Sequence, residues 1–154
     1  MQAAISRAAY DYRAGPAVPR FADDRPIVVF DGKCVLCSAF ARLVLRTDRH
    51  RRFRLLAAQS PIGDALYRHF GLDTTNYETN VLLEDGRAYF QSEATIRILA
   101  ELGGPWRMTS AGRILPLRAR DRLYDVIARN RFRWFGARQT CYVPDPAEAD
   151  RFLS

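Results

Sequence analysis

IVVFDGKCVLC, residues Ile27–Cys37, is an apolar run that ends in Asp-Gly and continues into two cysteines three positions apart. The β-branched run Pro26–Phe30 predicts a strand in the middle of a covered sheet, and Asp31-Gly32 ends it. Residues 35–47 carry apolar side chains at helical spacing and predict an amphipathic helix. We therefore expect the cysteines at a strand-to-helix junction, where free amides and the positive end of the helix dipole favour a thiolate.

The spacing of Cys34 and Cys37 is typical of a redox dithiol. Two cysteines in the first turn of a helix can form a disulfide with little backbone strain. We expect Cys34 to point its sulfur toward solvent and to act as the nucleophile, with Lys33 favouring its thiolate. Cys37 is expected to be more buried, and to stay protonated until it resolves the mixed disulfide. The sequence thus predicts an enzyme of thiol-disulfide exchange.

Other interpretations of these residues stay open. Asp31 disfavours a thiolate by its charge, accepts a proton from Cys37 during resolution, or only ends the strand by bonding turn amides. A zinc site needs four ligands, and the remaining candidates Cys141, His50 and His69 are isolated, so no metal or other cofactor is expected. As a further alternative, both cysteines pack as small apolar side chains. Cys141 is expected to be an inert packed thiol rather than a third redox thiol.

Strands and helices alternate along the chain after the cysteines. Further strands are expected at residues 53–57, 80–84 and 87–90, and further helices at residues 60–70 and from a Ser92 cap to a stop at Gly103-Gly104-Pro105. A helix between the first two strands makes them parallel, and Asp85-Gly86 predicts a hairpin. The order βαβαββα predicts an α/β fold, namely a thioredoxin-like four-stranded mixed sheet with a C-terminal helical extension.

The chain divides into three expected parts. Residues 1–25 show no sustained helical or strand periodicity of apolar side chains, which predicts a flexible N-terminal lead-in. Residues 26–104 form the thioredoxin-like core, and residues 105–154 form a helical extension packed on the same domain. The buried stripe of the long helix in this extension is expected to contain Leu117, Leu123 or Tyr124, Ile127 and Phe132.

Composition narrows the function classes. The formal net charge is +7, and Lys33 is the single lysine among 24 basic residues. Nucleic acid is not the favoured partner, because charge balance reports on non-specific association. No apolar run reaches the length of a transmembrane helix, and the N-terminus does not have the order of a secretory signal. Three cysteines with one close pair fit a reactive site in the cytoplasm.

Several motifs beyond the dithiol belong to one family pattern. The matching residues are Asp31-Gly32-x-Cys34-x-x-Cys37, Ser92-Glu93-Ala94, Leu102-Gly103-Gly104-Pro105-Trp106, Tyr124, Ala128-Arg129-Asn130-Arg131, Trp134-Phe135-Gly136 and Cys141. The chain resembles the DCC family of thiol-disulfide oxidoreductase-like proteins over residues 26–153.

The resemblance implies a thioredoxin-like fold and thiol-disulfide exchange, with Asp31, Cys34 and Cys37 as the naming residues of the family. It also implies roles for Arg129, Arg131 and Trp134. We expect this aromatic and arginine-rich segment to fold over the dithiol, with an arginine that offsets the Asp31 charge.

The sequence departs from ordinary thioredoxins opposite the dithiol. Tyr77–Asn80 stands where those proteins carry a cis-proline, and Thr79 is expected to replace part of its role.

The main expectation is an oxidoreductase that acts on a protein or small-molecule thiol or disulfide. The alternative is a non-catalytic or redox-sensing module whose basic C-terminal helices dock an acidic partner. The sequence indicates neither the substrate nor the oligomeric state.

Overall fold

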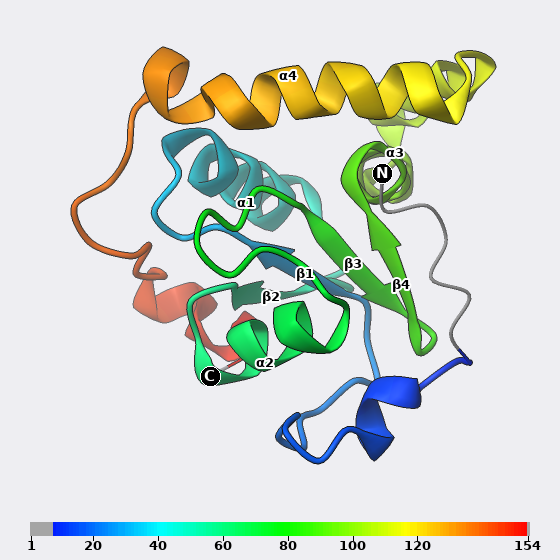
Figure 1. Cartoon of the computed structure of the whole chain (residues 1–154). Coiled ribbons are helices and arrows are strands. Elements are labelled where there is room, and N and C mark those ends of the chain that lie inside the picture. Colours follow the sequence, from blue (N-terminus) through cyan, green and yellow to red (C-terminus); the bar gives the residue numbers. More distant parts are fainter. Residues whose placement is uncertain (1–7, 154) are drawn as a thin grey trace.

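A computed structural model describes residues 8–153 of the chain and contains one mixed sheet of four strands (Figure 1). The strands are β1 Ile27–Phe30, β2 Arg54–Ala57, β3 Val81–Glu84 and β4 Arg87–Phe90, in the spatial order β2-β1-β3-β4. Strand β2 is parallel to β1, whereas β3 is antiparallel to both β1 and β4. This confirms the predicted thioredoxin-like α/β fold and its mixed sheet.

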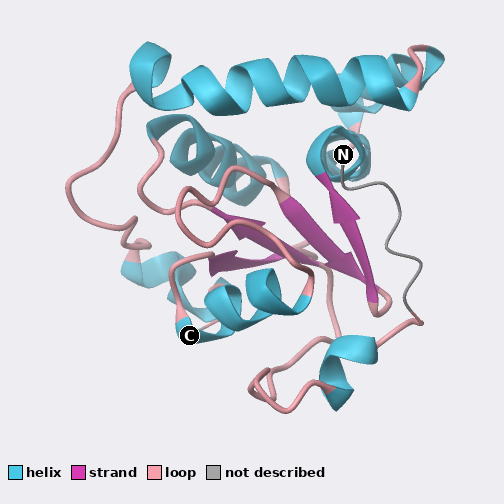
Figure 2. Ribbon diagram, in the orientation of Figure 1, coloured by secondary structure: helices cyan, strands magenta, loops and turns pink. Residues whose placement is uncertain are grey.

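Helices cover both faces of the sheet. The α-helices are α1 Val35–Thr47, α2 Pro61–His69, α3 Gln91–Leu102 and α4 Leu117–Phe135, and three 3-10 segments span Asp11–Ala14, Gly104–Ile114 and Pro146–Arg151. Figures 1 and 2 show α2 on one face of the sheet and α1 with α3 on the other. Helix α4 lies outside α1 and α3 as a further layer and contacts both.

The side chains of β1 point alternately to the two faces of the sheet, and so contribute to a separate core cluster on each face. Ile27 and Val29 pack in a cluster with the α2 side chains Ile62 and Leu66. Val28 packs in the opposite direction, with α1 and α3 side chains. Successive strand residues point to opposite faces, so a strand buried on both sides must be apolar throughout. All four residues of β1 are buried, and the strand therefore fixes the position of the Asp31-Gly32 turn at its end.

Two helix starts differ in how they are capped. The predicted Ser60 cap is confirmed, because its hydroxyl accepts a hydrogen bond from the Gly63 amide at 3.1 Å. The predicted Ser92 cap is wrong, because α3 already begins at Gln91 after an extended Phe90. The Ser92 hydroxyl is buried and donates to the Asp121 carboxylate of α4 instead. Ser92 therefore joins two helices rather than starting one.

The predicted buried stripe of α4 is wrong for its aliphatic and phenylalanine members, whereas the alternative member Tyr124 does face inward. Leu117, Leu123, Ile127 and Phe132 are 37–60% exposed, and the fully buried side chain of this helix is Arg131. Helix α4 contacts α3 through polar groups, such as the Asp121 carboxylate that accepts from the Ser92 hydroxyl, and its Tyr124 hydroxyl donates to the Glu78 carbonyl in the loop before β3. An apolar period alone cannot identify the inward face when that face is polar.

Part of the predicted flexible lead-in packs on the core instead. Tyr12 is 1% exposed and belongs to the cluster beneath α2, and its hydroxyl donates to Asp23 at 2.7 Å. The same carboxylate pairs with Arg13 at 2.8 Å. Residues 1–7 lie outside the described residues, and the division between residues 104 and 105 stays a prediction.

Candidate active site

The two cysteines lie at the first turn of α1, as the sequence predicts. Cys34 has extended backbone angles and is the N-cap of the helix, and its Sγ accepts a hydrogen bond from the Cys37 amide at 3.2 Å. All three cysteines of the chain are free thiols. The predicted exposures are reversed, because Cys34 is fully buried and Cys37 is partly exposed. The first turn of α1 thus provides an amide to the Cys34 sulfur without leaving that residue open to solvent.

A segment from the other end of the chain covers Cys34. We call residues Gly136–Arg138 the strap. The Val35 amide donates to the Gly136 carbonyl at 3.4 Å, the Arg138 amide donates to the Lys33 carbonyl at 2.7 Å, and Cys34 forms an antiparallel bridge with Ala137. The strap runs beside Cys34 as a short strand would, and this explains the missing exposure of Cys34.

Cys141 follows the strap and lies against the same turn. The Tyr142 amide donates to the Gly32 carbonyl at 2.8 Å. A Cβ atom added to Gly32 would lie 3.6 Å from the Cys141 Cβ, so this turn and the Cys141 side chain are in van der Waals contact range. Residues that are separated by more than 100 positions in the sequence therefore form one layer over the dithiol turn.

The two thiols have opposite pKa shifts. The pKa of Cys34 is lowered to about 7, mainly by a hydrogen bond from the Cys37 thiol and also by the Cys37 amide and the charge of Arg131. Burial and the Asp31 charge act in the opposite direction. The pKa of Cys37 is raised, first by its hydrogen bond to Cys34 and then by burial. These opposite shifts favour the proton on Cys37 and the thiolate on Cys34.

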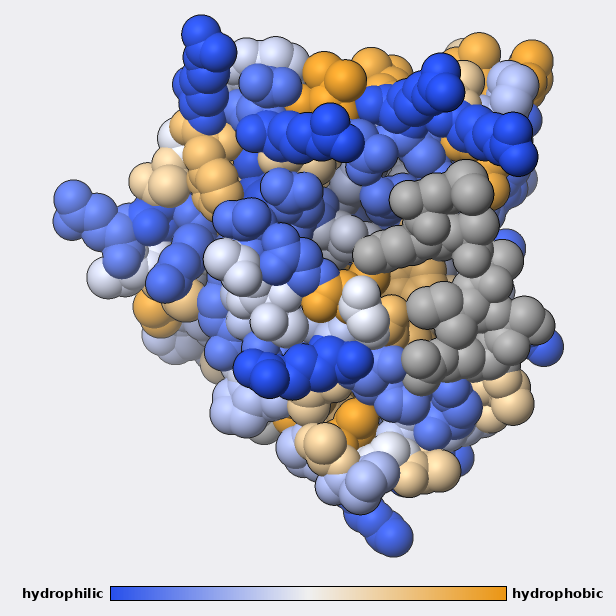
Figure 3. Space-filling view, viewed as in Figure 1, coloured by the Kyte–Doolittle hydropathy of each residue, from blue (hydrophilic) through white to orange (hydrophobic). Residues whose placement is uncertain are grey.

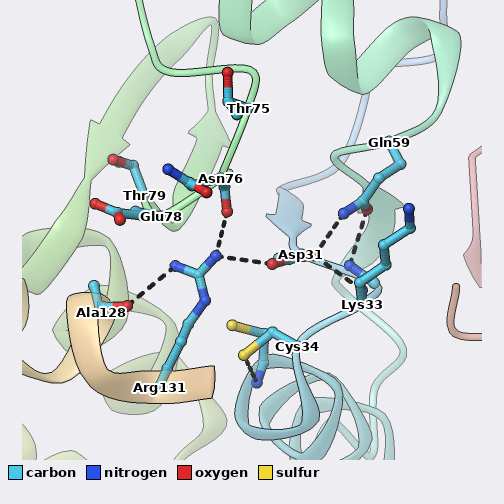
Figure 4. A network of polar contacts seen from close by, with 12 residues as sticks. Asp31, Lys33, Cys34, Gln59, Thr75, Asn76, Glu78, Thr79, Ala128 and Arg131 are labelled. Atoms are coloured by element: carbon cyan, nitrogen blue, oxygen red, sulfur yellow. Dashed lines mark hydrogen bonds and ion pairs between the residues drawn. The ribbon is translucent and has the colours of Figure 1, made fainter. Parts of the chain in front are cut away.

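Asp31 is part of a buried ion pair beside the dithiol (Figure 4). Its Oδ2 lies 2.9 Å from Arg131 Nη2, and both side chains are 2% exposed. Its Oδ1 accepts hydrogen bonds from the Lys33 amide at 2.9 Å and from Gln59 Nε2 at 2.5 Å. A buried carboxylate needs such partners, because an unpaired charge in the interior is costly.

Arg131 has one nitrogen that these contacts do not use. Nη2 also donates to the Asn76 carbonyl, and Nη1 donates to the Ala128 carbonyl at 3.5 Å. Nε is buried and has no hydrogen-bond partner. Figure 4 shows the guanidinium between Asp31, Asn76 and the sulfur of Cys34. A buried cation with an unused donor beside a low-pKa thiol is suited to stabilise a thiolate.

This dithiol turn falls within the match to a known family. A family model described as DCC1-like thiol-disulfide oxidoreductase matches residues 28–137, from β1 to the strap. The chain belongs to this family. Membership supports a redox role for the dithiol.

Two relatives of the chain cover most of its length. The uncharacterized protein YuxK of Bacillus subtilis is 35% identical over 127 residues, which are 82% of this chain and 93% of the relative. A chloroplastic DCC family protein of Arabidopsis thaliana is 36% identical over 120 residues, which are 77% of this chain and 70% of the relative. No solved protein structure matches the chain. Because the plant relative is named as chloroplastic, the cytoplasmic location stays a prediction for this chain.

The other predicted site residues lie at different distances from the dithiol of this DCC1-like protein. Lys33 is exposed, and its side chain points away from Cys34 in Figure 4. Arg129 and Trp134 are exposed on α4. Thr79 is buried, and its carbonyl accepts a hydrogen bond from the Tyr67 hydroxyl. The structure thus brings together Asp31, Arg131 and the cysteines, but not Lys33, Arg129 or Trp134.

One residue of the site, Gln59, and the contacts of another, Tyr124, were not predicted from the sequence. Gln59 bonds both Asp31 and the Gly32 amide, the latter at 3.0 Å. Its position offers a usable signal, because it follows β2 by two residues and the ends of β1 and β2 are in register. Tyr124 accepts from the Asn80 amide at 2.7 Å and so holds the loop opposite the dithiol. The sequence marks Tyr124 as a motif residue and as a candidate for the buried stripe, but no local pattern predicts these contacts, because the partners are more than 40 residues away.

Two further observations concern residues 8–153. No cluster of three or more histidine, cysteine, aspartate or glutamate side chains there is arranged to hold a metal ion. Likewise, none of the helices within this range has the length and apolar character needed to traverse a bilayer. The peptide bonds in this range are all trans, including those of residues 77–80 opposite the dithiol.

Proposed function

We propose that this protein is a thiol-disulfide oxidoreductase in which Cys34 attacks and Cys37 resolves. The observation that supports this assignment is the opposite shift of the two pKa values at the first turn of α1. With a pKa of about 7, Cys34 is about half thiolate at neutral pH and is close to the optimum for an attacking thiol.

The reaction runs in two exchange steps. The Cys34 thiolate attacks one sulfur of a substrate disulfide, the substrate S–S bond breaks, and the leaving thiolate takes a proton from solvent. Cys37 then loses its proton and attacks Cys34 Sγ, which releases the second substrate thiol. The substrate gains two electrons, and the enzyme is left with a Cys34–Cys37 disulfide. A dithiol reductant returns the enzyme to its starting state by the reverse exchange.

In this mechanism Arg131 stabilises the Cys34 thiolate, and Asp31 holds Arg131 in place. Both oxygens of Asp31 already accept hydrogen bonds, and one of them is paired with the guanidinium. Both oxygens are therefore engaged with donors other than the Cys37 thiol. We therefore favour a positioning role for Asp31 over the alternative in which it takes the proton of Cys37.

Access to Cys34 requires movement of the strap. Cys34 is 0% exposed and is bridged to Ala137, so a bulky substrate cannot reach its sulfur while the strap is paired. We expect N-ethylmaleimide to modify Cys34 faster than a maleimide attached to a long polyethylene glycol chain. Replacing Arg138 by proline is expected to reduce this difference in rate, because proline has no amide hydrogen to donate to the Lys33 carbonyl.

A thiol-trapping titration tests the function. Wild type, Cys34→Ser, Cys37→Ser and Cys141→Ser are equilibrated in redox buffers between about −270 and −120 mV, the range of known exchangers, and the free thiols are blocked. We expect a Cys34–Cys37 disulfide in wild type and in Cys141→Ser, and none in the other two variants. If wild type forms no such disulfide across this range, the oxidoreductase assignment is wrong.

The burial of Cys34 favours one alternative. A thiol that is covered by the strap and faces a loop without a cis-proline is also compatible with a binding or redox-sensing module. Such a module would dock an acidic partner through its basic C-terminal helices. A dithiol that oxidises in the titration above but does not reduce a small disulfide such as cystine at a measurable rate would favour this alternative.

A further inference from the structure

The outer face of α4 carries large apolar side chains that the core does not use. Val126, Leu123, Trp134 and Ile127 are 49%, 60%, 54% and 37% exposed. At about 100° per residue, these four positions fall in one sector about 100° wide, which also contains Asn130. We call them the apolar stripe. Ile114 and Leu115 are also exposed just before the helix and extend the apolar surface at its N-terminal end.

Arginines run beside the apolar stripe. Arg118, Arg122, Arg129 and Arg133 are exposed, and none of them forms an ion pair with another of residues 8–153. Helical spacing places all four in a neighbouring sector about 60° wide. We call them the arginine ridge. Figure 3 shows hydrophilic side chains along α4, with hydrophobic ones at the upper edge of the molecule.

No acidic side chain of α4 balances this outer surface. The two carboxylates of α4 are Asp121 and Asp125, and both face inward. Asp121 accepts from the Ser92 hydroxyl, and Asp125 accepts from Gln91 Nε2 at 3.0 Å. The outward half of the helix is therefore positive and apolar at once.

We propose that α4 docks on an anionic lipid bilayer, lying parallel to its surface with the apolar stripe in the headgroup region. A helix with an apolar stripe, an adjacent arginine-rich face and a tryptophan near one end is typical of interfacial binding. Arginine side chains can place their stems along the apolar boundary while their charges meet lipid phosphates. Helix α4 is the outermost layer of the fold, so its outer face is open to a flat bilayer (Figure 1).

Docking in this orientation would bring the dithiol edge close to the bilayer. Trp134 precedes the strap residue Gly136 by two positions, and the Gly136 carbonyl accepts from the Val35 amide of α1. The proposal rests on the surface of α4 alone and stands or falls independently of the redox chemistry.

Vesicle flotation tests the proposal with the whole chain. Vesicles of phosphatidylcholine alone are compared with an equimolar mixture of phosphatidylcholine and phosphatidylglycerol. We expect binding to the mixed vesicles only, weakened by added salt. The triple variant Arg122→Gln, Arg129→Gln, Arg133→Gln should bind roughly a hundredfold more weakly, since each basic side chain at such a surface contributes about a factor of five.

A matched triple variant controls for net charge. Arg20→Gln, Arg49→Gln, Arg87→Gln removes the same three charges from exposed positions outside α4 and should keep most of the binding. Equal losses in the two triples would overturn the proposal, because binding would then be non-specific. So would a failure of folded wild type, verified by circular dichroism, to bind the mixed vesicles. The proposal would also be overturned if the protein bound soluble poly-glutamate in preference to vesicles, because this would indicate an acidic polypeptide as the partner of α4.

Trp134 provides a second readout. The chain has two tryptophans, so Trp106→Phe leaves Trp134 as the single tryptophan fluorophore. We expect its emission to shift to shorter wavelength when mixed vesicles are added, and Leu123→Gln to weaken the binding at least severalfold. Emission that does not change while the protein is bound would contradict insertion of the apolar stripe.

Discussion

Two buried aspartate–arginine pairs flank α1, and they differ in one respect. Asp31 precedes the helix and pairs with Arg131 at 2.9 Å, and Asp48 follows the helix and pairs with Arg151 at 2.5 Å. In both pairs the arginine comes from the C-terminal part of the chain, and each side chain is 4% exposed or less. The two pairs are therefore alike in chemistry, burial and separation along the sequence.

The hydrogen bonds of the two guanidinium groups separate the pairs. Every nitrogen of Arg151 has a partner: Nη1 donates to the Leu45 carbonyl at 3.1 Å, while Nε and Nη2 donate to the Phe53 carbonyl at 3.4 and 3.3 Å. Asp48 also accepts from the Phe53 amide at 2.8 Å. Arg131 has an unpartnered Nε and lies beside the cysteines. A buried ion pair is thus no sign of function by itself, whereas an unused donor next to a reactive group is.

Replacement of Arg151 should give the largest effect on stability. Arg151→Met leaves Asp48 buried without its cation, and loss of one partner of a buried pair costs about 3–5 kcal/mol of unfolding free energy. We expect a lower urea midpoint with an unchanged m-value, and a Cys34 pKa that remains at its wild-type value of about 7. A shift of the Cys34 pKa in this variant would remove the distinction between the two pairs.

Replacement of Arg131 should change reactivity as well as stability. The charge of Arg131 lowers the pKa of Cys34, so Arg131→Met should raise it above about 7 and reduce the thiolate fraction at neutral pH. The rate of iodoacetamide alkylation rises with pH through this pKa, and we expect the variant to react roughly fivefold more slowly at pH 7.

The measurement for Arg131→Met is the full pH profile of alkylation, followed by mass spectrometry in a Cys37→Ser, Cys141→Ser background. Because Cys37 itself lowers the Cys34 pKa, the comparison is made within that background, with and without the Arg131→Met substitution. Arg129→Met is the matched control, since Arg129 is exposed on the same helix. Profiles that coincide with and without Arg131 would exclude its proposed role.

Neutralisation of Asp31 should shift the Cys34 pKa in the opposite direction to Arg131→Met, and by a smaller amount. The Asp31 charge raises the Cys34 pKa, so Asp31→Asn should move the alkylation profile to lower pH and speed the reaction at pH 6 by roughly two- to threefold. Asp48→Asn should leave the profile in place. A slower reaction of Asp31→Asn would indicate that anchoring of Arg131 outweighs the loss of the negative charge.

Replacement of Lys33 should have the smallest effect on the reactivity of Cys34. It neighbours Cys34 in the sequence but is exposed and points away from the sulfur. Because an exposed charge is screened by water and salt, we expect Lys33→Met to change the alkylation rate at pH 7 by less than about twofold. A larger change would restore the role that the sequence suggested for this residue.

The local elements of the fold could be predicted well because neighbouring residues encode them. The buried run of β1, the helical period of residues 35–47 and the Asp85-Gly86 hairpin each need only a short window of sequence. All three appear in the structure at their expected places. The position of Cys34 and Cys37 at the start of α1 follows from the same short window.

The tertiary structure decided what surrounds the dithiol. The burial of Cys34 by Ala137, the pairing of Asp31 with Arg131 and the polar inner face of α4 all join residues that are far apart in the sequence. No period or spacing encodes such contacts, because they arise only when α4 settles across α1 and α3. The sequence alone therefore determined the place of the two thiols, whereas tertiary packing determined their access to solvent and the charge beside them.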